Sequence, residues 1–366
     1  MITTKRNYRF HVEDTKSVLW WGRSDLDYSR NRIVLRLFSD LGFKVDFYHP
    51  LASRTGLLEA YLRRLKRPDL IWVPCFRHRD ISSALHWADK WKVPLVIDPL
   101  ISAYEKAVFE NKKWPPDSSL AQRMRRWESR LLRQGDLVVA DTTAHAKFFT
   151  EFLEIPEEKL SVLYVGAEVK YFIPKPYPLL KPPFEILFYG SFLPLQGVDI
   201  IIKAAQLTQD LPFRWVLLGD GPLRREAEKA SIGLKNINFE PWIDYKQLAN
   251  RIANAHILLG VFGTTKKANL VIPNKVFQSM AVGRPVITRN ADAYNDNLGK
   301  SDIIGWVPGG DPDALASRVK EWLASPDDLI QRGAETIVLF DKYFAYEKLK
   351  NLQRFILEKI FGSSTI

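Results

Sequence analysis

The sequence predicts an α/β protein made of two doubly wound domains that face each other across a cleft. The chain has 366 residues, about twice the usual size of one domain. Short apolar strands alternate with amphipathic helices from end to end, a pattern typical of parallel sheets with helices on both faces. Residues 174–183 hold five prolines and no periodicity, as a linker between domains does.

The first half contains five apolar runs that end in turn residues. They predict strands at 17–22, 44–50, 69–75, 94–99 and 136–142. Amphipathic stretches predict helices at 29–42, at about 81–91 and in a long region that ends near 134. We therefore expect a first domain at residues 1–173.

The second half repeats the alternation. It predicts strands at 184–190, 213–221, 237–242, 256–262 and 285–289, with helices between most of them. This pattern gives a second domain at residues 184–342. Residues 343–361 form one amphipathic helix, which we expect to return to the N-terminal domain.

The composition limits the partners. A net charge of +11 favours an anionic partner, which could be nucleic acid, an anionic membrane or a phosphorylated small molecule. A single cysteine and six scattered histidines give no disulfide and no metal site. The start lacks the apolar run of a signal peptide and no 18-residue apolar run occurs, so we expect a cytoplasmic chain.

The stretch "VIPNKVFQSMAVGRPVIT", residues 271–288, predicts a short helix followed by a buried strand. Pro273 suits the helix start and Gly283 its end. The first-turn amides and the helix dipole favour a bound phosphate, and Lys275 would add a positive charge there. Gln278, one turn later, could hydrogen-bond hydroxyl groups. The alternative is that Lys275 and Gln278 lie on a solvated helix face.

Longer segments resemble a known family. "FEILFYGSFLPLQGVDIIIKAA", "WVLLGDGPL" and "HILLGVFG…IPNKVFQSMAVGRPVIT" resemble, in order and spacing, the nucleotide-sugar domain of family-4 glycosyltransferases, which have the GT-B fold. "VPLVIDPLISAYEKAVFENKK", "DLVVADTTAHAKFF" and "EKLSVLYVGAEVKYF" resemble the acceptor domain of the same family. The "PNK" turn is similar to that of a bacterial subgroup.

The resemblance implies a glycosyltransferase that moves a sugar from a nucleotide-diphosphate sugar to an acceptor hydroxyl with retention. It implies no cofactor and no metal, and a saccharide or lipid-linked acceptor in surface polysaccharide or glycolipid synthesis. The expected donor-binding residues are Gly190, Ser191, Gly219, Asp220, Gly221, Trp242, Ile243, Lys266, Lys267, Pro273, Asn274, Lys275, Val276 and Gln278.

The sequence departs from the family at four of these positions or their neighbours. The usual Glu-x7-Glu pair falls on Leu270 and Gln278, and the usual Arg and Lys after the first strand of this domain fall on Ser191 and Gln196. Lys275, with Lys266 or Lys267, is then the expected source of positive charge at the diphosphate.

The catalytic residues expected from the resemblance are His78, Asp98 and Lys275. His78 would lie close to the reacting sugar, although a lone histidine is more often structural, and Asp98 could bind a sugar or cap a turn. The expected acceptor-binding residues are Gly22, Arg23, Arg30, Arg32 and Arg77, and the alternative for the arginines is a solvated helix face.

Two basic segments, 54–67 and 112–133, mix arginines with leucines and aromatic residues. Such a mixture is typical of interfacial helices, so we expect peripheral contact with an anionic inner membrane face, in part through Arg123, Arg125, Arg126 and Arg130. The alternatives are amphipathic helices packed on the sheet, or a nucleic-acid surface. We expect no nucleic acid, because no known binding motif is present.

Two other functions fit parts of the pattern. A nucleotide-sugar epimerase shares the fold. A non-catalytic nucleotide-sugar-binding relative would explain Leu270, Ser191 and Gln196.

Overall fold

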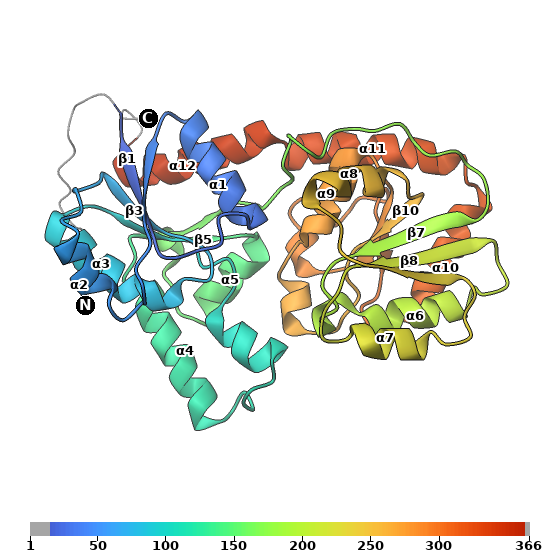
Figure 1. Cartoon of the computed structure of the whole chain (residues 1–366), viewed down its shortest axis with the longest axis horizontal. Helices are drawn as coiled ribbons and strands as arrows, with labels where there is room; N and C mark the ends of the chain where they lie inside the picture. The colour runs from blue at the N-terminus through green and yellow to red at the C-terminus, as the bar shows by residue number, and fades with distance from the viewer. Residues whose placement is uncertain (1–14, 363–366) are drawn as a thin grey trace. The chain divides into compact units, whose positions relative to one another are not determined.

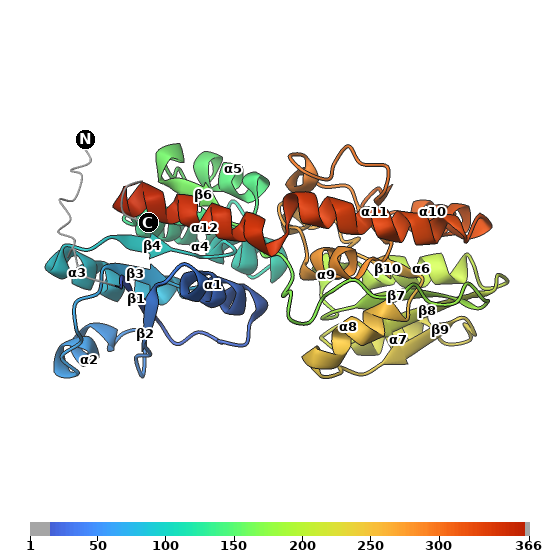
Figure 2. The same cartoon turned by 90° about the horizontal axis from the view of Figure 1, so that it is seen from above.

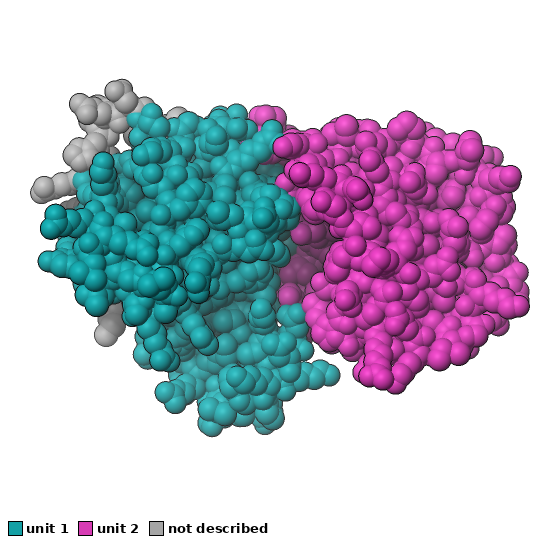
Figure 3. All heavy atoms as spheres, viewed as in Figure 1, with its two compact units in different colours: residues 1–165, 349–366 teal, residues 166–348 magenta. Residues whose placement is uncertain are grey.

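The computed structural model describes residues 15–362, which form two compact units. One unit comprises the chain up to Val165 together with the residues from Leu349 onward, and the other comprises Gly166–Lys348 (Figure 3). The first fourteen residues of the predicted first domain, which hold most of the stretch tested for a signal peptide, lie outside the described residues.

The first unit contains a six-stranded parallel sheet in the order β2-β1-β3-β4-β5-β6 (Figure 1). Its strands are β1 (Ser17–Trp21), β2 (Lys44–Tyr48), β3 (Leu70–Val73), β4 (Leu95–Ile97), β5 (Leu137–Ala140) and β6 (Leu160–Val162). Its helices are α1 (Ser29–Asp40), α2 (Gly56–Leu62), α3 (Ile81–Trp91), the π-helix η2 (Glu105–Glu110), α4 (Ser119–Leu132), α5 (Thr143–Glu151) and α12 (Tyr346–Phe361).

The strands β1, β3, β4 and β5 are continuous apolar runs that are buried along almost their whole length, so both faces of this sheet are apolar and helices cover them. On one face the ring of Phe38 from α1 meets the edge of Trp72, with the ring centroids 5.1 Å apart. The ring centroids of Phe361 in α12 and Phe43, which follows α1, are 6.0 Å apart, so α12 packs beside α1 on this unit (Figure 2). On the other face Trp21 packs with residues of α3, α4 and α5 in one buried cluster.

The second unit contains a parallel sheet of six strands in the order β12-β11-β10-β7-β8-β9. Its strands are β7 (Phe184–Tyr189), β8 (Phe213–Leu218), β9 (Ile237–Glu240), β10 (Ile257–Leu259), β11 (Val286–Arg289) and β12 (Gly305–Val307). Its helices are α6 (Val198–Gln206), α7 (Arg224–Ala230), α8 (Tyr245–Ala253), α9 (Asn274–Val282), α10 (Pro312–Ala324) and α11 (Asp328–Tyr343).

The prediction of two parallel α/β sheets is confirmed, and the strand order shows where each sheet can bind a ligand. In the first sheet the chain moves outward from β1 to β2 and then returns to β3 on the other side of β1. In the second sheet the same reversal separates β7 from β10. In open α/β sheets, ligands bind outside the carboxyl ends of the strands at such a reversal. A ligand of either unit is therefore expected at the loops after β1 and β3 or at the loops after β7 and β10.

Two features differ from the sequence prediction. The three-residue edge strands β6 and β12 were not predicted as strands. The helix expected over 343–361 begins only at Tyr346, because α11 ends at Tyr343 and Phe344 and Ala345 separate the two helices. The buried ring of Phe344 packs against Phe277 of α9 instead of continuing either helix.

Candidate functional site

In the second unit, the loop after β7 and the start of α9 meet around Lys275. Pro273 is the N-cap of α9, and Gly283 ends the helix in the left-handed conformation. Lys275 is 5% exposed and Gln278 is 3% exposed, so the alternative of a solvated helix face is wrong. Val276, Phe277, Met280 and Ala281 of the same helix are also buried.

The ammonium group of Lys275 has few partners. Its Nζ donates to Oε1 of Gln196 at 2.6 Å and lies 3.7 Å from the centroid of the Phe188 ring. No carboxylate pairs with Lys275 among the residues that the structure describes. Burial alone holds the pKa of Lys275 well below its usual value. A buried cation without a counter-ion at a helix N-terminus is a binding position for an anion.

Gln196 and Ser191 are the two positions where the family usually has basic residues. Gln196 lies between β7 and α6 and supplies the acceptor for Lys275. Ser191 is exposed directly after β7. Gly190 lies so close to Lys275 that a Cβ on it would be 3.0 Å from the lysine Nζ. The ammonium group of Lys275, which belongs to α9, therefore lies beside the loop after β7, where the family usually has basic residues of the loop itself.

The glycines of "GDGP" are required by a close approach of two loops. A Cβ on Gly219 would lie 2.1 Å from the backbone oxygen of Gly190, and one on Gly221 would lie 2.6 Å from the backbone nitrogen of Phe192. The backbone N–H of Phe192 also donates to the oxygen of Asp220 at 2.9 Å. The loops after β7 and β8 therefore touch backbone to backbone, and side chains at these glycines would separate them.

Gln278 belongs to a chain of hydrogen bonds that runs from a buried tyrosine to two half-buried residues. Its Oε1 accepts from the hydroxyl of Tyr189 at 2.9 Å, and its Nε2 donates to the hydroxyl of Tyr245 at 3.2 Å. Tyr245 in turn donates to Glu168 at 2.7 Å. Both ends of the amide are therefore engaged within the protein, and a direct contact with a ribose stays a prediction.

The other residues expected at the donor lie around the same edge of the sheet. Trp242 is exposed and Ile243 half-buried after β9, and Asp220 is exposed after β8. Lys266 and Lys267 begin the short helix η5 (Lys266–Asn269) in the loop between β10 and α9. Asn274 is half-buried in the first turn of α9. The N–H of Val276 donates to the oxygen of Pro273 at 2.9 Å, and the Val276 side chain is buried.

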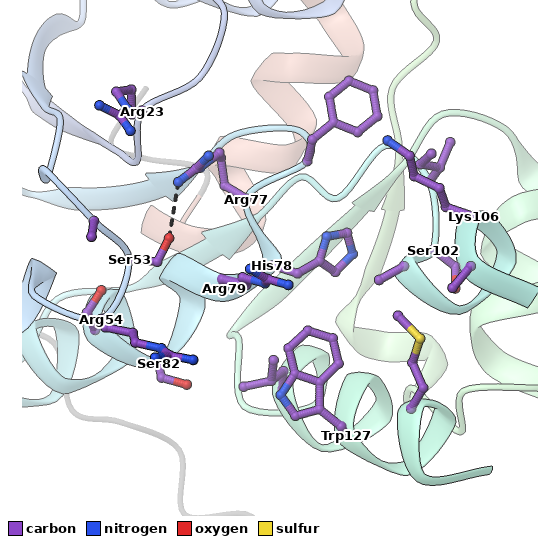
Figure 4. A pocket seen from close by; sticks show the side chains of 18 of the residues that line it. Arg23, Ser53, Arg54, Arg77, His78, Arg79, Ser82, Ser102, Lys106 and Trp127 are labelled. Atoms are coloured by element: carbon purple, nitrogen blue, oxygen red, sulfur yellow. Dashed lines mark hydrogen bonds between the residues drawn. The ribbon is translucent and has the colours of Figure 1, made fainter. Parts of the chain in front are cut away.

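In the first unit, the loops after β1 and β3 border a pocket of 1430 Å³ (Figure 4). Its lining residues come from these loops, from the segment around α2, from η2 and from α4. The basic residues among them are Arg23, Arg54, Arg77, Arg79, Lys106, Lys113 and Arg123. No aspartate or glutamate is among the described residues that line it. The pocket is therefore suited to an anion.

His78 lies in the wall of this pocket and is 8% exposed (Figure 4). Its Nε2 is 3.1 Å from Oε1 of Glu128 on α4, which is buried. Glu128 also accepts hydrogen bonds from the hydroxyl of Ser102 at 2.7 Å and from the backbone N–H groups of Ala103 and Tyr104 at 2.6 and 2.8 Å. Glu128 thus holds the histidine and the start of η2 in one place. Burial opposes the charge, but His78 and these donors keep the pKa of Glu128 below its usual value.

A substitution at Glu128 should show how much this carboxylate stabilises the unit. Glu128→Gln replaces one acceptor oxygen by a donor that faces other donors, so the free energy of unfolding should fall by about 1.5–3 kcal/mol. Glu151→Gln is a matched control, because that carboxylate is exposed and lies 3.7 Å from Lys147. Denaturant unfolding of both variants measures the difference, and equal stability of the two would contradict this role.

Asp98, predicted to be catalytic, and several arginines predicted to bind an acceptor have other roles. Arg30 and Asp98 are both buried and form an ion pair, with Nε 2.9 Å from Oδ2, and Arg30 also donates to the oxygen of Leu163. The pair joins α1 to the end of β4, so the expectation that either residue meets a ligand is wrong. Arg32 lies on α1 and donates to the backbone oxygen of Asp27 in the loop before this helix. Only Arg23 and Arg77 of the predicted arginines line the pocket.

The structure adds residues that the sequence did not single out for this pocket, namely Arg54, Lys106, Lys113, Arg123 and Trp127. The guanidinium group of Arg77 donates from Nε to Oδ2 of Asp80 at 2.5 Å and from Nη2 to the hydroxyl of Ser53 at 3.2 Å. Gly22, at φ 127°, lies against both Arg77 and Asp80. Among residues 15–362, no cluster of His, Cys, Asp or Glu could hold a metal ion.

Comparison with known proteins agrees with this architecture. Residues 183–325 match the model "Glycosyl transferases group 1", and residues 22–166 match "Glycosyl transferase 4-like domain". The putative colanic acid biosynthesis glycosyltransferase WcaL of Escherichia coli K12 is 28% identical over 198 residues, which are 52% of this chain and 48% of WcaL. The amylovoran biosynthesis glycosyltransferase AmsK of Erwinia amylovora is 24% identical over 54% of this chain and 51% of AmsK. The chain thus matches about half the length of these relatives.

Solved structures share the fold at low identity. The sucrose-phosphate synthase of Thermosynechococcus elongatus has a TM-score of 0.73 at 15% identity and covers 96% of this chain and 100% of its own. Anabaena HepE, solved in complex with UDP, has a TM-score of 0.70 at 15% identity and covers 94% of this chain and 100% of its own. The two family models cover the greater part of both units. The chain belongs to the family-4-like glycosyltransferases of GT-B fold.

Proposed function

We propose that the chain transfers a sugar from a nucleotide-diphosphate sugar to an acceptor hydroxyl, with retention and without a metal or other cofactor, in the synthesis of a surface polysaccharide or glycolipid. The observation that supports it most is the buried Lys275 ammonium, without a carboxylate partner in the described chain, at the strand reversal of the second sheet. HepE, a structural neighbour, was solved with UDP and with UDP-glucose. WcaL and AmsK are named for polysaccharide synthesis.

In this proposal the second unit binds the donor. The diphosphate lies at the first turn of α9, where the helix N-terminus and Lys275 stabilise the negative charge that grows as the glycosidic bond breaks. Gln196 holds the ammonium toward the loop after β7. The nucleoside extends past Gly219 and Gly221 toward Trp242 and Ile243. Lys266 and Lys267 contribute further positive charge.

The first unit binds the acceptor in its basic pocket. His78 faces the transferred sugar and Glu128 fixes the position of its ring. The acceptor hydroxyl attacks the anomeric carbon on the face that the diphosphate leaves and gives its proton to the departing diphosphate oxygen, so no carboxylate nucleophile is needed. Positioning and electrostatic stabilisation supply most of the rate acceleration.

The test is a thermal-shift screen of nucleotide sugars, followed by product analysis with the matching donor in excess chelator. A matched donor should raise the unfolding temperature by mass action. Nuclear magnetic resonance of the product should then show the donor's anomeric configuration. Epimerised free nucleotide sugar would support the epimerase instead, and binding without turnover would support the non-catalytic relative.

His78→Ala should lower turnover about tenfold or more while nucleotide affinity changes little, because His78 lies in the first unit and is proposed to meet only the transferred sugar. His86→Ala is the control, since that histidine is exposed on α3 and is absent from the lining of the pocket. The measurement is steady-state kinetics with the matched donor. Equal turnover in the two variants would make His78 a structural residue.

The proposal includes peripheral contact with an anionic membrane. None of the helices that the structure describes has the length and apolarity to cross one. Leu51 in the loop before α2, and Leu58, Tyr61 and Leu62 of α2, are each between 60% and 72% exposed. Arg54, Arg63, Arg64 and Lys66 surround these side chains in the sequence and are exposed. Such a combination is typical of an interfacial surface.

Leu58→Ser with Leu62→Ser should therefore reduce co-sedimentation with anionic vesicles at low salt, and high salt should reduce it in the unmodified protein as well. The earlier expectation for Arg125 needs correction. Arg125 donates to the oxygen of Phe152 at 2.7 Å and pairs with Glu154, so it is a packing residue and not part of this test. Vesicle binding that is unchanged by the leucine substitutions would remove α2 from the contact.

A further inference from the structure

The basic pocket of the first unit has a second wall that is apolar. Helix α4 turns Leu120, Met124, Trp127 and Leu131 toward the pocket, at spacings of three and four residues that place them on one helix face. Leu120 is 50% exposed and Trp127 is 37% exposed, so these side chains are open to whatever fills the pocket. Arg123 lies on the same face, within this apolar row.

The apolar wall continues at the segment around α2. Leu51 and Leu57 line the pocket and are 72% and 43% exposed. They adjoin Leu58 and Leu62, the exposed side chains of the surface proposed to meet a membrane. The pocket therefore extends from the basic loop after β3 to an exposed apolar surface on the same unit.

On the basic side of the pocket Arg77 pairs with Asp80, but three other arginines have no carboxylate partner in the described chain. Among residues 15–362, no ion pair involves Arg54, Arg79 or Arg123. Figure 4 shows the Arg54, Arg77 and Arg79 side chains on one side of His78 and Lys106 on the other. The pKa of the neighbouring His49 is lowered by burial and by the positive charges of Arg23 and Arg77. An anion of two or more charges would relieve this repulsion.

We infer that the acceptor is a lipid-linked phosphate or diphosphate, whose charged group binds among Arg77, Arg79 and Arg123 and whose hydrocarbon chain lies along Leu120, Trp127 and Leu57. This inference rests on the proposed function for the statement that the pocket receives the acceptor. The combination of basic and apolar walls favours this class over a neutral saccharide, which would leave the cations without a counter-charge. It also favours it over a soluble sugar phosphate, which would leave the leucines exposed to water.

Because the pocket has a basic wall and an apolar wall, binding of the phosphate group and binding of the hydrocarbon chain can be tested separately. Three probes suffice: farnesyl diphosphate, inorganic diphosphate and farnesol. Titration followed by tryptophan fluorescence, with calorimetry for confirmation, should give an affinity for farnesyl diphosphate at least tenfold higher than for either of the others. Equal affinity for farnesyl and inorganic diphosphate would overturn the lipid part. No binding of either diphosphate would overturn the whole inference.

Variants of the basic wall and of the apolar wall should have different effects on the binding of the two diphosphates. Arg79→Gln with Arg123→Gln should weaken both diphosphates about tenfold or more, whereas Leu120→Ser with Leu57→Ser should weaken only farnesyl diphosphate. Arg126→Gln with Arg130→Gln is the matched control, since both arginines are exposed on α4 and absent from the pocket lining. Equal losses in the control and in the Arg79 and Arg123 variant would show general attraction to a basic protein and would overturn the site.

One further variant separates this inference from the proposed function. Lys275→Met removes the cation of the second unit, so farnesyl diphosphate should bind it as tightly as it binds the unmodified protein. Loss of that binding would place the probe at the donor position and overturn the inference. Failure of every nucleoside diphosphate to bind the unmodified protein, with farnesyl diphosphate still bound, would contradict the donor proposal and leave the lipid-phosphate site supported.

Discussion

Lys275→Met should lower the affinity for a nucleoside diphosphate tenfold or more, while leaving the free energy of unfolding equal or higher. The contact between an ammonium and a phosphate contributes about 1.5–3 kcal/mol, which the methionine cannot supply. Burial of the Lys275 ammonium, 5% exposed and without a carboxylate partner in the described chain, opposes folding, and methionine removes that cost. Calorimetric titration and denaturant unfolding of the two proteins measure the two effects.

The nucleoside alone is the control ligand, because Lys275 is proposed to meet only the phosphates. Its affinity should be the same in both proteins. Equal losses for nucleoside and nucleoside diphosphate, or a large loss of stability, would make Lys275 a residue that maintains the fold and would contradict its role at the diphosphate.

The same lysine should make diphosphate binding depend on pH. Burial lowers the pKa of Lys275 in the free protein, and a bound diphosphate would raise it by favouring the ammonium. The affinity should therefore be constant below the free-protein pKa and fall by about tenfold per pH unit above it, until the pKa of the complex is reached. Measurements above about pH 7 avoid titration of the phosphates themselves. The Lys275→Met protein should show no such fall.

Gly219→Ala should destabilise the second unit and abolish nucleotide binding together. The new Cβ would lie 2.1 Å from the oxygen of Gly190, so the loops after β7 and β8 must separate. Crowding of this kind costs about 1–3 kcal/mol, in addition to the strain of an L-residue at φ 131°. Because Gly190 lies against Lys275, the movement would also displace the proposed diphosphate position.

Gly233→Ala is the matched control for this substitution. Gly233 also has a positive φ, of 90°, but a Cβ there would have nothing within 4 Å. The control thus measures the backbone strain without the crowding. Denaturant unfolding should show a larger loss for Gly219→Ala than for Gly233→Ala. Equal losses would mean that the contact between the two loops is not needed.

The positions of most strands and the two-unit organisation could be predicted from the sequence because each element leaves a local pattern, whereas the order of the strands within each sheet comes from the structure. The apolar runs that became β1, β3, β7 and β8 are bounded by turn residues. The edge strands β6 and β12 have only three residues each, too few for a periodicity to stand out. The break between α11 and α12 depends on the packing of Phe344 against Phe277, which no local pattern records.

For the candidate site too, some residues could be predicted from the sequence and others could not. Lys275 could be identified because a helix start with a lysine in its first turn is a local signal. The pairing of Arg30 with Asp98 could not, because 68 residues separate them and either residue alone resembles a ligand-binding side chain. The two tyrosines that engage Gln278, and the pocket residues spread from Arg23 to Leu131, are brought together only by the fold.

The proposed reaction of this chain is sugar transfer from a nucleotide-diphosphate donor bound at Lys275. The most direct measurement is the acceptor-dependent release of nucleoside diphosphate from the matched nucleotide sugar, in excess chelator, by the unmodified protein and by Lys275→Met. The account predicts release that requires acceptor, persists in chelator and falls at least tenfold in the variant. Release that is equal in the two proteins, or no release with any nucleotide sugar that binds, would contradict it.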